Sequence, residues 1–297
     1  MSAASVLEHL DPSRYAITEI GITREGKWLT GNNVLAKMST GHLQDLLPVA
    51  LFPEPRAGQL YVQKGTTLEP YRCIDVFFPV LHGTFGEDGT LQGLLELADV
   101  AYVGCGVLSS SVGMDKGLFK DVMIARGIPV VDYTITNRVQ IQHDLDGVIA
   151  EIEGKLTYPV FVKPVNLGSS VGITKCSHRA DLLEGLMESA RFDRRVIVER
   201  GVDAREIEVS VLGNEEPVAS LPGEIRPSEE FYDYRAKYIS NRSELIIPAE
   251  LDAEMTARVR SLAAEAYKAV DGAGMARVDF LLDRKTGELF LSEVNTI

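Results

Sequence analysis

Apolar and polar residues alternate along the first part of the chain at spacings that switch between the strand period and the helix period. The predicted elements are a helix from residue 2, a strand over 15–22, a strand over 73–83, a helix over 90–98 and a strand over 101–104. Alternating helices and strands predict a parallel or mixed sheet. Because an open α/β sheet rarely begins with a helix, a first strand is expected to be missing before Ser2.

The rest of the chain shows the same kind of alternation. It predicts helices over 114–127, 145–154 and 179–190 and strands over 129–136, 159–164, 195–200 and 206–213, with Ser177 as the N-cap of the third helix. Residues 221–248 lack a period, and a loop of this length usually covers a site. A long helix over 249–270 and a final hairpin follow.

Composition and length narrow the class of protein. With 297 residues, two or three subdomains are expected. The 45% hydrophobic and 25% charged residues are typical of a soluble globular protein. No apolar run approaches the ~18 residues of a membrane span, and the N-terminal sequence lacks the basic and apolar order of a signal peptide. We therefore expect a cytoplasmic protein.

Net charge limits the kinds of ligand to expect, and cysteine content limits the kinds of covalent link and metal site. A net charge of −13 disfavours nucleic acid as a partner. The charge of an anionic ligand must therefore be neutralised by a few lysines and arginines close to it, or by metal ions. Cys73, Cys105 and Cys176 are widely spaced, which argues against both a disulfide framework and a zinc site. Buried or half-buried thiols are expected.

The closing stretch, "ARVDFLLDRKTGELFLSEVNTI", places acids within apolar strands. If "KTG" forms a three-residue turn with Gly287 at positive φ, Asp279 faces Glu293 and Arg277 faces Asn295 on one side of the hairpin. A four-residue turn would shift the register and separate the two acids. Facing desolvated carboxylates need a proton or a cation between them, and oxygen ligands suit Mg²⁺ beside substrate phosphates. The alternative is a solvated face without a metal.

Two glycine-rich loops could contact an anionic ligand. In "VFVKPVNLGSSVGI", Lys163 ends an apolar strand before a Gly/Ser turn whose N–H groups could close over phosphate, although such a loop alone is more often a simple turn. The P-loop pattern occurs nowhere. In "HGTFGEDGTLQG", His82, Glu87 and Asp88 follow a buried strand, where α/β sheets bind ligands, but a structural His82 is the alternative. Lys116 begins a helix after a Ser/Gly-rich stretch.

Six segments together resemble the D-alanine:D-alanine ligases, which have the ATP-grasp fold. They are "HGTFGEDGTLQG", "MDKGLFK", "VKPVNLGSSVG", "VERGVDAREIEVSVLG", "FYDYRAKY" and "ARVDFLLD…LSEVNTI". The resemblance implies an α/β fold in which a parallel α/β N-terminal domain (1–104) precedes two α+β subdomains (105–205 and 206–297) that grip ATP between them. It also implies a homodimer formed through the N-terminal domain.

The resemblance further implies roles for individual residues. The implied ATP ligands are Lys116, Lys163, Ser170 and Lys237 for the phosphates, Glu199 and Val202 for adenine, and Glu206 for ribose. Two Mg²⁺ (or Mn²⁺) ions would bind Asp279, Glu293 and Asn295, with Glu293 bridging. Arg277 would stabilise the tetrahedral oxyanion, Ser169 and Tyr238 would orient substrate, and His82 would lie near the first D-alanine.

The implied reaction forms D-alanyl-D-alanine for peptidoglycan precursors. ATP phosphorylates one D-alanine to an acyl phosphate, and the amine of a second D-alanine then attacks it and expels phosphate. An enzyme accelerates such phosphoryl transfer mostly by positioning the reactants and neutralising their charge. The resemblance further implies that tyrosine at position 238 is typical of family members that make D-alanyl-D-alanine.

The sequence departs from the family at both ends. The family's first strand with its Gly-rich loop, and its segment beyond "E-x-N-T" with a substrate-binding serine, are expected to be missing. Two alternatives follow: a remnant that binds Mg-ATP without ligase activity, or an ATP-grasp ligase that uses D-lactate or D-serine as acceptor.

Overall fold

The computed structural model describes residues 2–56, 58–168, 171–226 and 244–296. These residues form two compact units. Unit 1 takes its residues from Met1–Val80 and Gly93–Val103, and unit 2 takes its residues from Leu81–Gln92 and Gly104–Ile297. Each unit has its own sheets and core.

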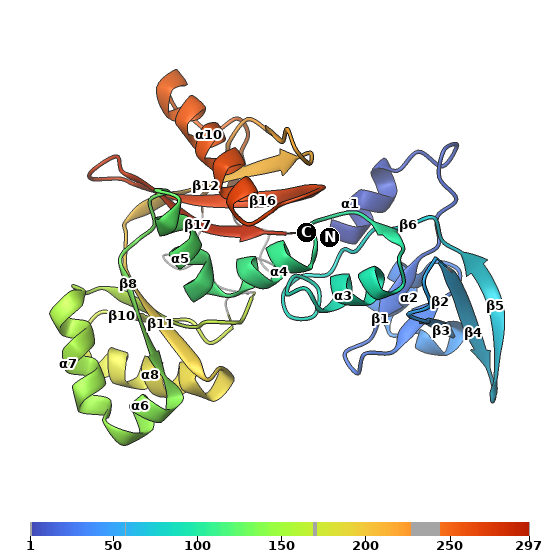
Figure 1. The fold of residues 1–297 in the computed structure, drawn as a ribbon, viewed down its shortest axis with the longest axis horizontal. Coiled ribbons are helices and arrows are strands. Elements are labelled where there is room, and N and C mark those ends of the chain that lie inside the picture. The colour runs from blue at the N-terminus through green and yellow to red at the C-terminus, as the bar shows by residue number, and fades with distance from the viewer. Residues whose placement is uncertain (1, 57, 169–170, 227–243, 297) are drawn as a thin grey trace. The chain divides into compact units, whose positions relative to one another are not determined.

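Unit 1 contains an antiparallel sheet whose strands lie in chain order, with short helices beside it (Figure 1). The strands are β1 (Ile20–Ile22), β2 (Trp28–Thr30), β3 (Leu47–Leu51), β4 (Gln59–Lys64) and β5 (Thr67–Cys73). The helices are α1 (Ser2–His9), α2 (Val34–Thr40) and the 3-10 helix η1 (Leu43–Asp45). Leu29, Val34 and Leu46 form a small buried cluster against which Met38 packs.

The pairing in unit 1 differs from the sequence prediction in one respect. Parallel pairing occurs between β6 (Val76–Phe77) and β7 (Ala101–Tyr102), with α3 (Thr90–Leu97) between them in the chain. The β1–β5 sheet is instead antiparallel throughout. A tight turn explains the pairing of β4 with β5, since strands joined in this way can only pair antiparallel; Lys64 pairs with Thr67 across this turn, where Gly65 has φ 62°.

Unit 2 contains a four-stranded antiparallel sheet in the order β10-β9-β11-β8. Its strands are β8 (Tyr133–Asn137), β9 (Val160–Pro164), β10 (Thr174–Cys176) and β11 (Arg195–Arg200). One face packs on α6 (Arg138–His143), α7 (Leu145–Lys155) and α8 (Arg179–Phe192) through Val162, Val198, Ile149 and Leu186. The predicted N-cap of α8 was wrong by one residue: His178, not Ser177, accepts the Asp181 N–H.

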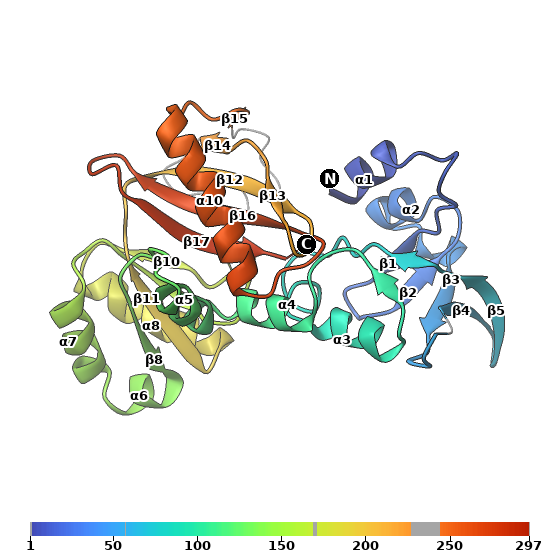
Figure 2. The same cartoon turned by 45° about the horizontal axis from the view of Figure 1, so that its top comes forward.

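A larger sheet in unit 2 has the order β15-β14-β12-β16-β17, with β13 also paired to β12. Its strands are β12 (Ala204–Leu212), β13 (Val218–Ala219), β14 (Gly223–Arg226), β15 (Glu244–Ile246), β16 (Met275–Asp283) and β17 (Leu289–Asn295). The helix α10 (Ala253–Ala269) lies along this sheet (Figure 2). Val259, Tyr267 and Phe280 share its core with residues near α4 (Val107–Met114) and from α5 (Lys116–Ala125).

The turn of the β16–β17 hairpin has four residues, 284–287, so the predicted three-residue turn was wrong. The Asp283 N–H donates to the Glu288 carbonyl, and the Gly287 N–H donates to the Asp283 carbonyl. Gly287 has φ 72°, the positive value expected for it.

The facing pairs predicted for this hairpin are nevertheless confirmed. Asp279 pairs with Glu293, and Arg277 pairs with Asn295. A β-bulge between Asp279 and Phe280 adds Ser292 to β17 and corrects the register that the longer turn had shifted. The two acids therefore share one face.

No helix among the residues that the structure describes is long and apolar enough to cross a bilayer.

Candidate functional site

The face of the larger sheet opposite α10 carries charged side chains from three adjacent strands. Burial alternates along β12 and β16, so Ile207, Val209 and Val278 point into the core while the residues between them are half-buried. On this half-buried face, Glu208 of β12 pairs with Asp279 of β16. Strand alternation thus gathers Glu206, Glu208, Arg277, Asp279, Glu293 and Asn295 on one surface.

Arg277 is held by two carboxylates on this surface. Its Nε and Nη2 donate to the two oxygens of Asp279 at 2.8 and 2.7 Å, and its Nε lies 3.5 Å from Glu208 Oε1. Burial alone would lower the pKa of Arg277, but Asp279 and Glu208 raise it above its ordinary value. The guanidinium is therefore a fixed cation beside the two facing acids.

Asp279, Glu293 and Asn295 offer only oxygen donors to a cation. Asn295 Nδ2 donates to Asp279 at 2.9 Å and to Glu293 at 3.4 Å, which holds the three side chains together. Within the described ranges, no group of three His, Cys, Asp or Glu side chains is placed to hold a metal ion. Two carboxylates and an amide nevertheless suit Mg²⁺, which usually takes a few protein oxygens and completes its shell with water and phosphate.

The start of α5 presents Lys116 to the segment that precedes the Gly/Ser loop. Asp115 caps this helix by accepting the Leu118 N–H at 3.0 Å, and it also pairs with Arg195. The backbone N–H of Lys116 donates to the Val165 carbonyl at 3.2 Å, and its Nζ donates to the Leu167 carbonyl at 2.5 Å. The structure thus brings together the two lysine-bearing segments predicted to bind phosphate.

The loop over residues 82–89 packs closely against Gly168. A Cβ on Gly168 would lie 3.0 Å from the Gly83 Cα, so a larger residue there would force the two loops apart. Glu87 accepts the Gly83 N–H. Burial raises the pKa of Glu87, the Gly83 N–H opposes the rise, and Glu293 adds to it. Glu87 therefore joins the electrostatic environment of the acidic face.

His82 lies in the same loop, and the charge of Arg277 affects its pKa. Partial burial of its ring, and then the charge of Arg277, lower the pKa of His82, although the residue as a whole is solvent-accessible. The imidazole is accordingly neutral at neutral pH.

Lys120, which was not predicted from the sequence, belongs to a buried ion cluster. Glu199 Oε1 lies 3.1 Å from Lys120 Nζ, and Glu199 Oε2 lies 2.6 Å from Lys163 Nζ. Burial pushes the pKa of Glu199 upward, but the two ammonium groups outweigh it and bring the pKa to about 2. The sequence feature that could have identified Lys120 is its position four residues after Lys116, on the same face of α5.

The remaining predicted residues fall into two groups. Glu206 and Val202 are half-buried, Glu206 on β12 and Val202 in the connection from β11 to β12. Ser169, Ser170, Lys237 and Tyr238 lie outside the described residues. Glu208 was also overlooked, although its two-residue spacing from Glu206 puts both acids on one strand face.

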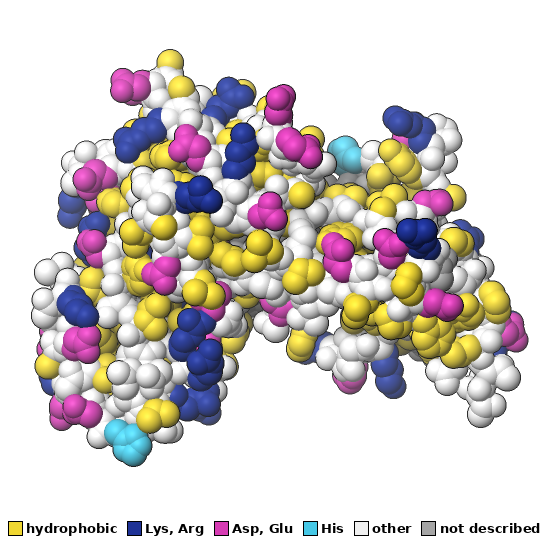
Figure 3. All heavy atoms as spheres, in the orientation of Figure 1, with side chains coloured by type: hydrophobic (Ala, Val, Ile, Leu, Met, Phe, Trp, Pro, Cys, Tyr) yellow, Lys and Arg dark blue, Asp and Glu magenta, His cyan; other side chains and the backbone are white. Residues whose placement is uncertain are grey.

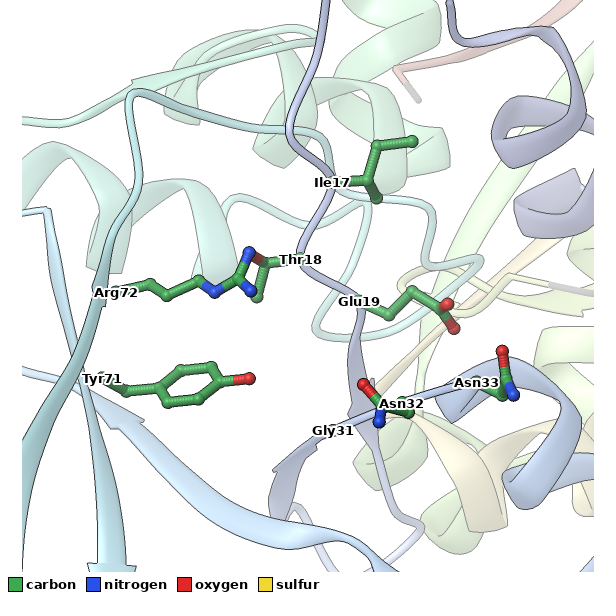
Figure 4. A pocket seen from close by; sticks show the side chains of 8 residues that line it. All are labelled: Ile17, Thr18, Glu19, Gly31, Asn32, Asn33, Tyr71 and Arg72. Carbon is green, nitrogen blue, oxygen red and sulfur yellow. The ribbon is translucent and has the colours of Figure 1, made fainter. Parts of the chain in front are cut away.

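Acidic and basic side chains are interspersed on the surface shown in Figure 3. A separate hollow of about 390 Å³ lies in unit 1, where Tyr71 and Arg72 of β5 point toward Thr18 and Glu19 (Figure 4). Glu19 Oε2 accepts the Leu35 N–H at 2.9 Å, and Arg72 Nη1 donates to Thr18 at 3.3 Å. None of the predicted site residues that the structure describes lines this hollow.

Comparison with protein families gives two matches. The family model for the N-terminus of D-Ala–D-Ala ligase matches residues 1–105, and the model for its C-terminus matches residues 122–297.

Named relatives agree with the family models. The D-alanine–D-alanine ligase of Heliobacterium modesticaldum is 47% identical over 296 residues, which covers 100% of this chain and 81% of the relative. The enzyme of the same name from Thermoanaerobacter sp. is 49% identical over 300 residues, which covers 100% of this chain and 82% of the relative.

Solved structures agree as well. The chain matches the VanG D-Ala:D-Ser ligase of Enterococcus faecalis with a TM-score of 0.85 at 36% identity, covering 100% of this chain and 84% of that one. It matches the D-alanine-D-alanine ligase of Coxiella burnetii with a TM-score of 0.83 at 34% identity, covering 100% and 79%. The fold is thus the ATP-grasp fold of ATP-dependent ligases. The chain belongs to the D-alanine–D-alanine ligase family, which serves peptidoglycan precursor synthesis.

Proposed function

We propose that this chain joins two D-alanine molecules into D-alanyl-D-alanine at the cost of one ATP. The observation that carries the proposal is the shared face on which Asp279, Glu293 and Asn295 meet Arg277. Family membership supplies the reaction class, and this face supplies oxygen ligands that would hold Mg²⁺, whose charge would neutralise a transferring phosphoryl group.

The proposed reaction has two steps. A carboxylate oxygen of the first D-alanine attacks the γ-phosphorus of ATP, and the bond to ADP breaks, leaving an acyl phosphate. The deprotonated amine of the second D-alanine then attacks the acyl carbon, an amide bond forms, and inorganic phosphate leaves.

The described residues take the following proposed parts. Lys116 and Lys163 hold the ATP phosphates, Glu199 and Val202 contact adenine, and Glu206 contacts ribose. Asp279, Glu293 and Asn295 would hold two Mg²⁺ or Mn²⁺ ions, which when bound neutralise phosphate oxygens. Arg277 stabilises the oxyanion of the second step, because a fixed donor acts best where charge develops. His82 stands near the first D-alanine.

The same proposal includes the roles that the family resemblance implies for Ser169, Ser170, Lys237 and Tyr238. It also includes the division of the chain after residues 104 and 205, and a homodimer.

The test is product formation by this polypeptide with ATP, Mg²⁺ and D-alanine. We expect ADP release that depends on D-alanine, together with D-alanyl-D-alanine detected by mass spectrometry. Glu293→Ala should abolish both signals. Binding of Mg-ATP without D-alanine-dependent turnover would instead support a nucleotide-binding remnant.

A D-serine acceptor is the second candidate, because the match to the D-Ala:D-Ser ligase structure covers the whole chain. A panel of D-alanine, D-serine and D-lactate at the acceptor position distinguishes the two. Dipeptide formation with D-alanine in clear preference to D-serine would exclude this candidate.

A further inference from the structure

Lys120, Lys163 and Glu199 form a compact ion cluster between α5 and the four-stranded sheet. The two lysines contact different oxygens of the one carboxylate, at 3.1 and 2.6 Å. The exposed fractions of the side chains are 2% for Lys120, 9% for Glu199 and 19% for Lys163. Lys120 is therefore the innermost member and Lys163 the outermost.

The fold leaves Lys120 no access to a ligand in solution. Its neighbours on α5, Phe119 and Met123, are buried in the core of the larger sheet. On the other side, its Nζ lies 5.6 Å from the centroid of the Tyr133 ring, which faces Glu199 across the β8–β11 pair. A lysine enclosed in this way acts through the groups that it touches.

The charges of the cluster do not balance. Two ammonium groups share one carboxylate, which leaves a formal excess of one positive charge in a largely desolvated place. Burial lowers the pKa of Lys120, and Glu199 opposes this change. Glu199 can therefore release one lysine and still remain paired with the other.

A lysine that binds phosphate must first leave its carboxylate partner. If Glu199 had Lys163 as its sole partner, that step would leave a buried carboxylate unpaired, which is strongly unfavourable. Because Lys120 occupies the other oxygen, Glu199 keeps a partner when Lys163 turns to the nucleotide.

We propose that Lys120 is a positioning residue that holds Glu199 ionised and in place, so that Lys163 is available to bind nucleotide phosphate. The inference rests on the proposed function only in taking Lys163 as a phosphate ligand. Lys120 itself contacts neither substrate nor nucleotide.

The first test is the affinity for Mg-ADP, measured by calorimetry on the full chain. Lys120→Met keeps the length of the side chain and removes its charge, so Lys163 becomes the sole partner of Glu199 among the described residues. We expect a Kd about tenfold or more above that of the wild type, the size that a shared buried ion pair gives. The matched control is Lys155→Met, which breaks an exposed pair with Glu151 and should leave the Kd unchanged.

The second test asks whether Lys120 acts through Glu199. In the Glu199→Gln background the carboxylate charge is gone, so adding Lys120→Met should change the Kd by less than about twofold. This comparison remains available if Lys120→Met alone fails to fold, because the double variant leaves no unpaired carboxylate. A further large loss in the double variant would mean that Lys120 acts independently of Glu199, and it would overturn the inference.

The outcomes separate this inference from the proposed function. A wild-type chain that binds no Mg-nucleotide would contradict the proposed function. Normal wild-type binding that Lys120→Met leaves unchanged would overturn the positioning role alone.

Discussion

Arg277 is the cation around which the acidic face of unit 2 is arranged. Its guanidinium spans both oxygens of Asp279 and approaches Glu208, so its position is fixed before any substrate binds. We expect Arg277→Met to lower kcat by about 10²–10³, the loss typical for removing one oxyanion donor, with a smaller change in KM. Steady-state kinetics would measure this. Arg284→Met removes an exposed arginine near Asp203 and should leave kcat unaffected.

His82 gives a prediction about pH. Because its folded-state pKa is lowered from 6.5, its contribution to stability is fully present above pH 6.5 and is lost as pH falls through the lowered value. The imidazole resonance assigned with His82→Gln should titrate by NMR with a midpoint below that of a histidine in a denatured chain. A midpoint at or above the denatured value would contradict the environment described for this loop.

At the scale of elements, α10 depends on one side chain for its start. Asp252 accepts the Met255 N–H at 2.7 Å and precedes the helix that carries Val259 and Tyr267 into the core. Asp252→Ala should lower the free energy of unfolding by about 1 kcal/mol, the usual value of an N-cap. Urea unfolding followed by circular dichroism would detect the shift. Asp252→Ser keeps a capping oxygen and should restore most of the loss.

Strongly periodic elements were predictable from sequence. The strand over 195–200 matches β11 residue for residue, and the helix over 90–98 matches α3 to within one residue. In both, local periodicity and tertiary burial agree. The five-stranded sheet of unit 1 was not predictable in the same way, because β5 has a mostly exposed face and lacks an apolar alternation.

The acidic site was predicted from a register that was only partly right. A four-residue turn alone would have placed Asp279 and Glu293 on opposite faces, and the bulge at Ser292 reverses that shift. A bulge depends on the pairing of two strands and leaves no clear sequence pattern. Likewise, the local sequence does not distinguish Lys120 from an ordinary exposed lysine on a helix, because residues distant in the chain bury it.

At the scale of the whole molecule, the net charge of −13 determines how a nucleotide polyanion can bind. In the proposed function its phosphates approach lysines that lie in the same unit as Asp279 and Glu293, so we expect divalent ions to offset the acid–phosphate repulsion. ATP at about a hundred times its Kd should add about 2.7 kcal/mol to the free energy of unfolding in Mg²⁺. Thermal melts should show that stabilisation in Mg²⁺ and little of it in EDTA. Glu293→Gln should lose the Mg²⁺-dependent part, whereas an equal rise of melting temperature in EDTA would mean that the lysines alone bind ATP and that the acids have no part in holding it.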